Sequence, residues 1–423
     1  MPVSDLKSSG LGIEFAAPQS VNDVIASLGR TEDVCFSPSN RRLAVAAFIR
    51  HRVALFDIGI ATSAAGPHVT LTGGVELSSP ALSSPHGLDF IDDETLIVAN
   101  RHGGVAMFKL PTGEIHPRSC EVLPIQTWPV DGASLLESPG SVAVAGVARG
   151  LHEILICNNT GHSVSRHRMD VGAGCVVSSE VLLRKWLDIP DGVRVSPDRR
   201  WIAVSNHNTH DVLLYENVPS LNEHTDPDGI LRGALYPHGL RFTPDGRYLF
   251  VADAGAPDVH VYAEDGTGWW GVRHPAATIR IMDESLFLRG RHNPQEGGPK
   301  GLAIDAGSNV LVATSEYQPL VFLDVPALLE RASAGDPVPT GRPYAAPLSG
   351  ALNGQMDDDP YERSRREQKA RDVRYELSVM AHSNAMKTRA MKAEAMVAAM
   401  GRRWSWRITA PLRRLHSALR WLR

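Results

Sequence analysis

One phrase recurs six times along the chain, and this repetition constrains the fold more than any other feature of the sequence. In its clearest copy, residues 237–253 read PHGLRFTPDGRYLFVAD: alternating apolar residues, a Pro-Asp-Gly turn and a second apolar run. The alternation predicts a half-buried strand, and the turn predicts a tight reversal into a second strand. The copies align on Asp33, Gly87, Gly140, Gly192, Gly239 and Gly301, at spacings of 54, 53, 52, 47 and 62 residues. A period of this length, built from short strands, predicts propeller blades rather than a helical solenoid.

The repeats therefore predict an all-β fold, a six-bladed β-propeller over residues 1–348. The apolar segment at residues 11–16 (LGIEFA) is expected to add an outer strand to the last blade and so close the ring. The recurring phrase resembles those of the NHL-repeat, YncE-like and SMP-30/gluconolactonase-like propellers. This resemblance covers residues 11–348 and implies the fold, but that group includes binders, scaffolds and hydrolases alike.

Cysteine usage and the N-terminus bear on the compartment. The four cysteines show no CxxC pairing, so neither a disulfide scaffold nor a cysteine zinc site is indicated, and a reducing compartment fits. The N-terminus has no basic region followed by an apolar core, and no window approaches eighteen apolar residues. We therefore expect a cytoplasmic protein that neither spans a membrane nor carries an export signal.

The shared register of the blades predicts two rings of side chains at one mouth of the central channel. The first ring holds the residue before each anchor position: Glu32, His86, Pro139, Asp191, His238 and Lys300. The second holds the last residue of each second strand: Ala47, Asn100, Asn158, Asn206, Asp253 and Ser315. A concave mouth lined by such groups is the default place for a small-molecule or sugar ligand. The predicted ligand-binding residues are His86, His238, Lys300, Asn100, Asn158, Asn206 and Asp253.

A divalent cation is one expectation for this mouth. In gluconolactonase-like propellers, the resemblance implies, an acid, an Asn and an Asp hold a cation that polarises a lactone carbonyl and activates water. Glu32 and Asp191 match that set in character, whereas no Asn occupies the matching position. His86 and His238 would shift the preference from calcium toward zinc. Lys300 would place a positive charge near the ion.

Structural roles are the alternative for each of these residues. Lys300 and Glu32 belong to adjoining blades and could form a simple channel salt bridge. The Asn/Asp ring could cap the following loops by accepting backbone hydrogen bonds. The histidines of SNHNTHDV (205–212) suggest a metal site, but we favour a surface loop for this segment, which could form a lip of the upper pocket. No GxSxG, HExxH or P-loop motif indicates another enzyme class.

The C-terminal region differs from the repeats in charge and composition. From Pro360 onward the chain has 16 Lys+Arg and 5 Asp+Glu, a balance of +11, whereas residues 1–359 carry −15. Residues 349–360 are interpreted as a linker, and 361–400 as a long helix, exposed or oligomerising, that could form a short coiled coil.

Residues 401–423 are predicted to form a basic amphipathic segment that binds an anionic membrane surface at the inner membrane, or a partner. Its docking on the acidic propeller stays open. Nucleic acid is not expected, because the folded domain has no basic patch. The residues expected at this contact are Trp404, Trp406, Arg407, Leu412, Arg413, Arg414, Leu415, Leu419 and Trp421.

The phrase SWRITAPLR (405–413) is similar to a segment near the ends of bacterial glycosyltransferases and associated proteins of surface-polysaccharide (O-antigen, capsule) assembly. It implies a shared docking or membrane-targeting element. Two functions follow as hypotheses. The first is a non-catalytic scaffold propeller that binds a sugar intermediate or partner enzymes at the membrane. The second is a metal-dependent lactonase or related hydrolase that uses Glu32, His86, Asp191 and His238.

Overall fold

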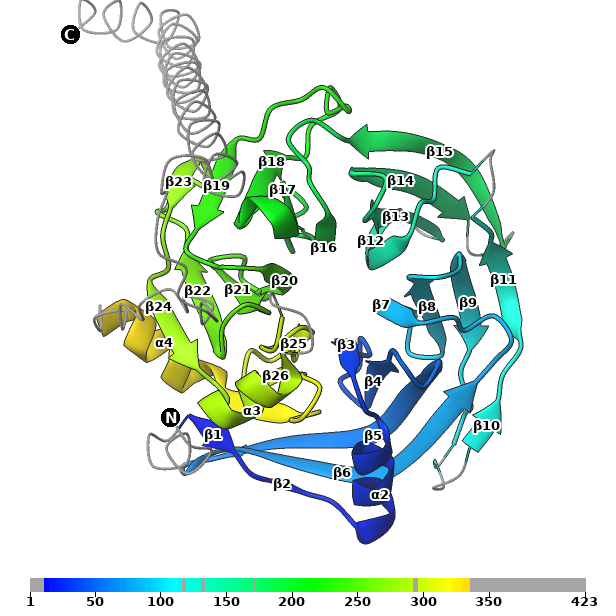
Figure 1. The fold of residues 1–423 in the computed structure, drawn as a ribbon, viewed down its shortest axis with the longest axis vertical. Helices are drawn as coiled ribbons and strands as arrows, with labels where there is room; N and C mark the ends of the chain where they lie inside the picture. Colours follow the sequence, from blue (N-terminus) through cyan, green and yellow to red (C-terminus); the bar gives the residue numbers. More distant parts are fainter. Residues whose placement is uncertain are drawn as a thin grey trace, which may run out of the picture. The chain divides into compact units, whose positions relative to one another are not determined.

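The computed structural model describes residues 11–113, 115, 119–130, 134–148, 150–170, 172, 174–291 and 296–334. They form six mainly antiparallel sheets arranged around a central axis (Figure 1). The predicted six-bladed, all-β propeller is thereby confirmed. These residues belong to the first of two units, Met1–Gln355; the second unit, Met356–Arg423, lies outside the described residues.

Each blade is a sheet of four successive strands, numbered here from the channel outward. The inner strands are β3 (Thr31–Phe36), β7 (Pro85–Asp92), β12 (Pro139–Ala148), β16 (Pro190–Val195), β20 (Pro237–Phe242) and β25 (Leu302–Ile304). The second strands are β4 (Arg42–Ala47), β8 (Thr95–Asn100), β13 (Leu151–Asn158), β17 (Trp201–Asn206), β21 (Tyr248–Asp253) and β26 (Val310–Ala313). The third strands are β5 (Arg52–Ser63), β9 (Val105–Lys109), β14 (Ser163–Asp170), β18 (Asp211–Glu216), β22 (Asp258–Ala263) and β27 (Val321–Asp324). The outer strands are β6 (Gly66–Ser78), β11 (Pro124–Trp128), β15 (Cys175–Leu183), β19 (Gly229–Arg232), β24 (Ala277–Arg280) and β1 (Gly12–Ile13).

The N-terminal segment closes the ring as predicted. Strand β1 pairs antiparallel with β27, with Gly12 opposite Leu323 and Ile13 opposite Phe322. The next short strand, β2 (Phe15–Ala16), pairs parallel with β6 of the first blade. One continuous segment therefore joins the last blade to the first, and the inner strands β25 and β3 contact each other at the same junction.

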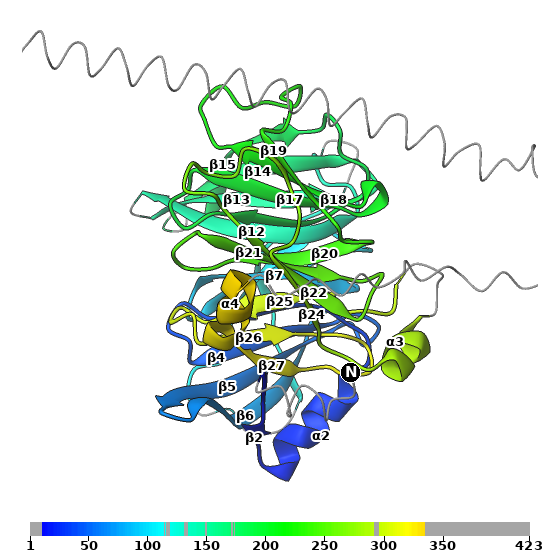
Figure 2. The ribbon, with the colours of Figure 1, turned by 90° about the vertical axis from the view of Figure 1, so that its left-hand side faces the viewer.

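Short additions cover parts of the rim. Strand β10 (Ser119–Glu121) extends the first sheet beside β6, and β23 (Gly271–Arg273) extends the fourth beside β19. The helical elements are α2 (Gln19–Ser27), η1 (His207–Thr209), α3 (Glu284–Gly290) and α4 (Val325–Ala334). Figure 2 shows α3 and α4 near opposite faces of the disc. No helix among the described residues has the length and apolar character needed to cross a membrane.

The hydrophobic core lies between neighbouring blades. Leu55 and Leu77 of the first blade pack with Leu88 and Val98 of the second, and all four are almost completely buried. Similar clusters lie between the second and third, fourth and fifth, fifth and sixth, and sixth and first blades, such as the one around Trp269 between the fourth and fifth. Burying a leucine side chain contributes about 1.5–3 kcal/mol, so face-to-face contact between blades is a large source of stability. These junctions hold the inner strands rigidly around the channel.

Candidate functional site

Irregular pairing at the start of the inner strands directs side chains into the channel. The strand register shifts there in five blades, between Thr31/Val34, Pro85/Gly87, Pro139/Ser141, Pro190/Gly192 and Pro237/Leu240. Such a bulge bends the strand and re-aims the extra residue. The residues re-aimed at the channel include Glu32, His86, Asp191 and His238, here called the upper cluster.

The anchor glycines are explained by the neighbouring inner strands. A Cβ atom at Gly87 would lie 2.5 Å from Cα of Ser141, and one at Gly239 would lie 2.3 Å from the carbonyl oxygen of Lys300. Gly239 also donates its backbone N–H to that oxygen at 2.8 Å. Backbones this close leave no room for any side chain. PHGL therefore combines a glycine required by packing with a histidine that faces the channel.

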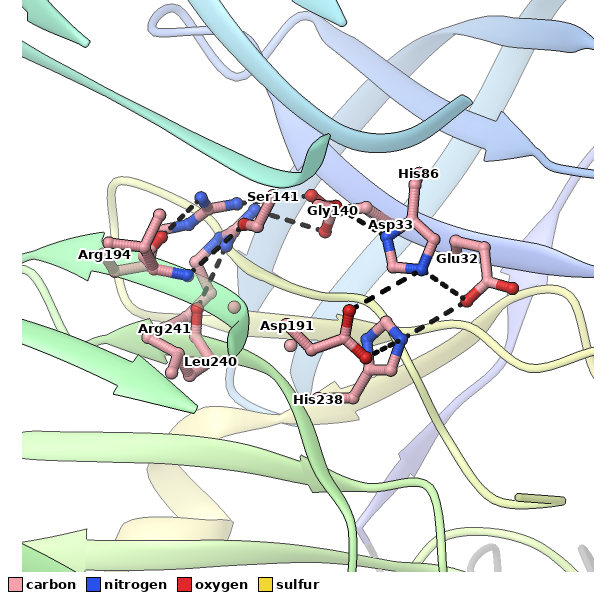
Figure 3. A pocket seen from close by; sticks show the side chains of 13 residues that line it. Glu32, Asp33, His86, Gly140, Ser141, Asp191, Arg194, His238, Leu240 and Arg241 are labelled. Atoms are coloured by element: carbon pink, nitrogen blue, oxygen red, sulfur yellow. Dashed lines mark hydrogen bonds and ion pairs between the residues drawn. The ribbon is translucent and has the colours of Figure 1, made fainter. Parts of the chain in front are cut away.

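The four side chains of the upper cluster converge on one point (Figure 3). Glu32 Oε2 lies 3.6 Å from His86 Nε2 and 3.4 Å from His238 Nε2. Asp191 Oδ2 lies 3.4 Å from His238 Nε2, and Asp191 Oδ1 lies 3.9 Å from His86 Nε2. All four side chains are at most 3% exposed. The sequence-predicted set is thus assembled at a single buried position.

Cations hold the outer oxygen of Glu32. Lys300 donates a hydrogen bond to Oε1 at 3.2 Å; its Nζ is also 3.1 Å from Oε2, but only the Oε1 contact has hydrogen-bond geometry. Arg30 also donates to Oε1. Lys300 and Arg30 contact a further carboxylate, Glu296, at 2.8 and 3.4 Å. The predicted Lys300–Glu32 salt bridge is confirmed, and it leaves Oε2 facing the histidines.

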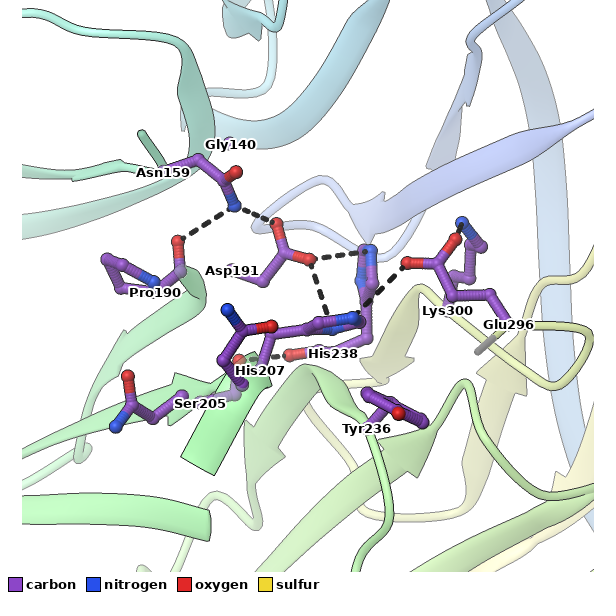
Figure 4. A network of polar contacts seen from close by, with 12 residues as sticks. Gly140, Asn159, Pro190, Asp191, Ser205, His207, Tyr236, His238, Glu296 and Lys300 are labelled. Atoms are coloured by element: carbon purple, nitrogen blue, oxygen red, sulfur yellow. Dashed lines mark hydrogen bonds and ion pairs between the residues drawn. The ribbon is translucent and has the colours of Figure 1, made fainter. Parts of the chain in front are cut away.

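Asp191 has a comparable division between its two oxygens. Oδ1 accepts hydrogen bonds from Arg101 Nη2 and Asn159 Nδ2, both at 2.9 Å. Oδ2 faces His238 and also His207, whose Nδ1 is 3.7 Å away. Figure 4 shows Asp191 between Asn159 and His207. In both acids, therefore, one oxygen accepts ordinary hydrogen bonds and the other faces an imidazole at a longer distance; for Glu32, the Lys300 ammonium also lies 3.1 Å from that second oxygen.

The electrostatics favour ionised acids and a neutral His86. Burial disfavours the Glu32 carboxylate, but Lys300 and Arg30 outweigh this and hold its pKa well below the usual value. Burial likewise disfavours the charged form of Asp191, and Arg101 outweighs it and lowers the pKa of that carboxyl group. Burial and the charge of Arg101 lower the pKa of His86 to about 3. At neutral pH the cluster therefore offers two carboxylates and at least one neutral imidazole.

A second group of charged residues follows the upper cluster along the inner strands. Asp33, Arg194 and Arg241, here called the lower belt, line the pocket together with the upper cluster. Arg194 Nη2 is 3.4 Å and Arg241 Nη2 is 3.6 Å from the Asp33 carboxylate. Arg241 also donates to the Val34 carbonyl at 3.0 Å. These contacts cross the channel between blades, so we expect a ligand to enter from the upper side.

The strand-end ring has a different role from the upper cluster. Asn100 accepts a hydrogen bond from Ser83 N and donates to the carbonyls of Ala81 and Gly104. Asn158 and Asn206 accept backbone hydrogen bonds from Glu137 and Asp188 of the preceding loops. Asp253 accepts them from Leu235 and Tyr236 before the strand and from Gly255 after it. All four residues therefore cap loop backbone, but mostly in the preceding loops and not in the following ones as predicted, and we leave them out of the proposed site.

The residue that follows the strand end reaches the channel in three of these blades. Arg101, Asn159 and His207 come directly after Asn100, Asn158 and Asn206, and all three contact or approach Asp191. These three residues were not predicted, although a shift by one residue in the aligned repeats would have found them. Assigning 205–212 to a surface loop was wrong for His207, whose side chain is only 5% exposed because η1 turns it inward.

The arrangement of the upper cluster fits a metal ion better than a hydrogen-bond network. A tetrahedral ion with bonds of about 2.1 Å separates its ligand atoms by about 3.4 Å, close to the distances between Glu32, His238 and Asp191. Among the described residues, Glu32 Oε2 and His238 Nε2 are buried and have no hydrogen-bond partner. Such orphaned atoms are rare without a missing ligand or water. Glu32, His86 and His238 also place one ligand atom each within 4.8 Å of one another, and Asp191, His207 and Glu296 form a second such group.

No protein-family model and no curated protein matches the chain. Among solved structures, the hydrazine synthase of Kuenenia stuttgartiensis is similar at 15% identity and a TM-score of 0.40, covering 70% of this chain and 83% of that one. A functionally unknown protein of Desulfotomaculum acetoxidans DSM 771 is similar at 13% identity and a TM-score of 0.44, covering 70% and 85%. At these identities and TM-scores, neither structure gives information about the function of this chain. The chain is therefore classed by its own sheet topology, as a six-bladed β-propeller; the narrower NHL, YncE-like or SMP-30 resemblance stays a prediction.

Proposed function

We propose that the protein is a ligand-binding propeller whose upper cluster holds one divalent transition-metal ion, and that this ion anchors a small polar ligand. The observation that carries the proposal is the spacing of Glu32 Oε2, His238 Nε2 and Asp191 Oδ2 at 3.4 Å steps, with the first two lacking hydrogen bonds among the described residues. Two imidazole nitrogens with two carboxylates favour zinc over calcium. Since zinc expands to five ligands, a ligand oxygen can join the four protein groups.

A metal titration with zinc tests this proposal. We expect one ion per chain in the full-length protein. The His238→Asn and Asp191→Asn variants should bind zinc at least 100-fold more weakly, since each removes a direct ligand. His224→Asn is the matched control, because His224 is a highly exposed histidine away from the channel. If supplemented protein holds no stoichiometric ion, or if the variants bind as well as the control, the site is not a metal centre.

Hydrolysis is a second candidate, favoured by one observation at the edge of the cluster. His207 is buried, its Nδ1 has no hydrogen-bond partner among the described residues, and its Nε2 lies 3.7 Å from Glu296 Oε1. A bound ion would lower the pKa of a coordinated water, and an imidazole beside it could accept the proton. This candidate predicts metal-dependent opening of simple lactones such as γ-butyrolactone that is lost in His207→Asn. Zinc binding without turnover would leave the protein a non-catalytic binder.

For the segment 401–423, which lies outside the described residues, we propose a tether to an anionic membrane surface that places the propeller among enzymes of surface-polysaccharide assembly. Support comes from the sequence alone: the arginines, leucines and tryptophans after Gly401 and the SWRITAPLR resemblance. Deleting residues 402–423 should release the protein from anionic vesicles. Retention of the truncated protein on vesicles would rule out this tether.

A further inference from the structure

Arg101 reaches the upper cluster through a gap in the ring of side chains. The register shift between Pro139 and Ser141 places Gly140 of the third blade, rather than the predicted Pro139, at the level of His86 and Asp191, so this blade presents no side chain there. A Cβ atom there would lie 3.2 Å from Asp191 Oδ1 and 3.3 Å from Arg101 Nη1. The absence of a side chain at residue 140 thus lets a guanidinium group from the second blade enter beside the metal position.

The guanidinium group occupies the lone pair of His86 Nε2 that a metal ion would need, and it holds Asp191 through Oδ1, the oxygen not assigned to the ion. Arg101 Nη2 lies 2.7 Å from His86 Nε2 and 2.9 Å from Asp191 Oδ1. His86 Nδ1 is 2.6 Å from the carbonyl oxygen of Gly140 and therefore carries the proton, which leaves Nε2 as the acceptor. An arginine is always charged in proteins. Without an ion, Arg101 is itself the cation that His86 and Asp191 bind.

Arg101 is incompletely satisfied in this position. Its Nη1 atom is buried and has no hydrogen-bond partner among the described residues. Near the cluster, the carboxylates of Glu32, Asp191, Glu296 and Glu316 face the cations Arg30, Arg101 and Lys300. A divalent ion would therefore change the net charge of the mouth from negative to positive. That positive charge favours an anionic ligand.

We propose that a metal ion displaces the Arg101 guanidinium group when it binds the upper cluster. The displaced guanidinium group then binds an anionic ligand together with the ion. This inference rests on the upper cluster being a metal site. One oxygen of a small carboxylate would bind the metal, and the other would accept a hydrogen bond from Arg101, whose fork of donors suits a carboxylate. The ligand class is thus a small carboxylic acid, because a neutral ligand of the same size lacks the charge that Arg101 would bind.

The test is a cobalt titration of the full-length protein in the presence of glycolate. A parallel titration uses ethylene glycol, a neutral analogue of similar size. The free cobalt concentration is corrected for cobalt–glycolate complexes in solution. In the unaltered protein, glycolate should tighten cobalt binding at least tenfold relative to ethylene glycol. Arg101→Gln removes the competing cation, so it should bind cobalt at least tenfold more tightly without anion and lose the glycolate effect. Arg200→Gln, which alters a half-exposed arginine paired with Glu216, is the control and should keep the glycolate effect.

The outcomes separate the two proposals. If cobalt binds but Arg101→Gln has the affinity and glycolate response of the unaltered protein, the exchange is wrong and the metal site stands. If neither protein binds cobalt, the metal site itself is wrong. Should Arg101→Gln fail to fold, Arg101→Lys replaces it: lysine keeps the charge but lacks the two-nitrogen fork, so most of the glycolate effect should be lost. An unchanged glycolate effect in that variant would overturn the role of Arg101.

Discussion

The upper cluster and the lower belt lie on the same inner strands, but they differ in how completely their buried polar atoms are partnered. Asp191 and Arg194 are three residues apart on β16, as are His238 and Arg241 on β20. In the lower belt, each carboxylate and guanidinium group has a partner, and no side-chain atom of Asp33, Arg194 or Arg241 is among the buried unpartnered atoms of the described residues. In the upper cluster, Glu32 Oε2 and His238 Nε2 are left without one.

The difference separates groups that stabilise the fold from groups kept ready for a ligand. A buried ion pair with complete hydrogen bonding resists change, since removing one partner strands the other. A buried polar atom without a hydrogen-bond partner lowers the stability of the fold. Such atoms are expected mainly at functional sites, where a ligand supplies the partner. We therefore expect substitutions in the lower belt to reduce stability strongly, and substitutions in the upper cluster to weaken ligand binding strongly.

The lower belt should give the largest loss of stability. Arg194→Ala removes one of the two guanidinium groups beside Asp33 and frees the carbonyl oxygens that Arg194 bonds, so we expect the free energy of unfolding to fall by about 3–5 kcal/mol. Urea denaturation measures it. Arg200→Ala, which removes a half-exposed pair with Glu216, should cost less than about 1 kcal/mol. Equal losses in the two variants would remove the structural role assigned to the belt.

A satisfied buried histidine elsewhere sharpens the contrast with His238. His167 contacts the hydroxyl groups of Ser179 and Ser165 at 2.8 and 2.9 Å, and burial lowers its pKa to about 4. Between pH 6.5 and 4 the unfolded state binds a proton that the folded state does not. Stability is therefore lost as the pH falls through this window, by about 3 kcal/mol in all. Urea denaturation at several pH values from 7 to 4 measures this loss. The free energy of unfolding should decline less steeply for His167→Asn than for the exposed control variant His224→Asn. Parallel curves for the two variants would contradict the role assigned to His167.

The strand-end ring should behave like the belt on a smaller scale. Asn100→Ala removes three hydrogen bonds to loop backbone, so we expect a loss of about 1–3 kcal/mol in the free energy of unfolding. Zinc affinity should stay within about twofold, because Asn100 is no metal ligand. A substitution at the exposed Asn22 is the control for urea denaturation. Weakened zinc binding with unchanged stability would return Asn100 to the ligand site.

The upper cluster should give the smallest loss of stability. His238→Asn removes a side chain whose Nε2 makes no hydrogen bond, so the metal-free protein should change by about 1 kcal/mol or less, while zinc binding is lost. Urea denaturation with and without zinc measures both effects. A loss as large as that of Arg194→Ala, without any change in zinc affinity, would make His238 a structural residue.

The sequence predicted the blades because the signals are local: alternation, a Pro-Asp-Gly turn and a fixed period. It also placed Glu32, His86, Asp191 and His238 together, since equivalent positions of equivalent blades must share a ring. It missed Arg101 and His207 because a strand end offers two adjacent polar residues, and only the geometry of the following turn decides which one faces the channel. Glu296 comes from a loop outside the repeats, where no periodicity places it.

The most direct test of the central claim is anomalous X-ray scattering at the zinc edge from crystals of the full-length protein grown with zinc. The account predicts one strong peak at about 2.1 Å from ligand atoms of Glu32, His86, Asp191 and His238, with Arg101 turned away from His86. A channel without a peak, with Arg101 still on His86 and zinc bound only to surface histidines, would contradict it.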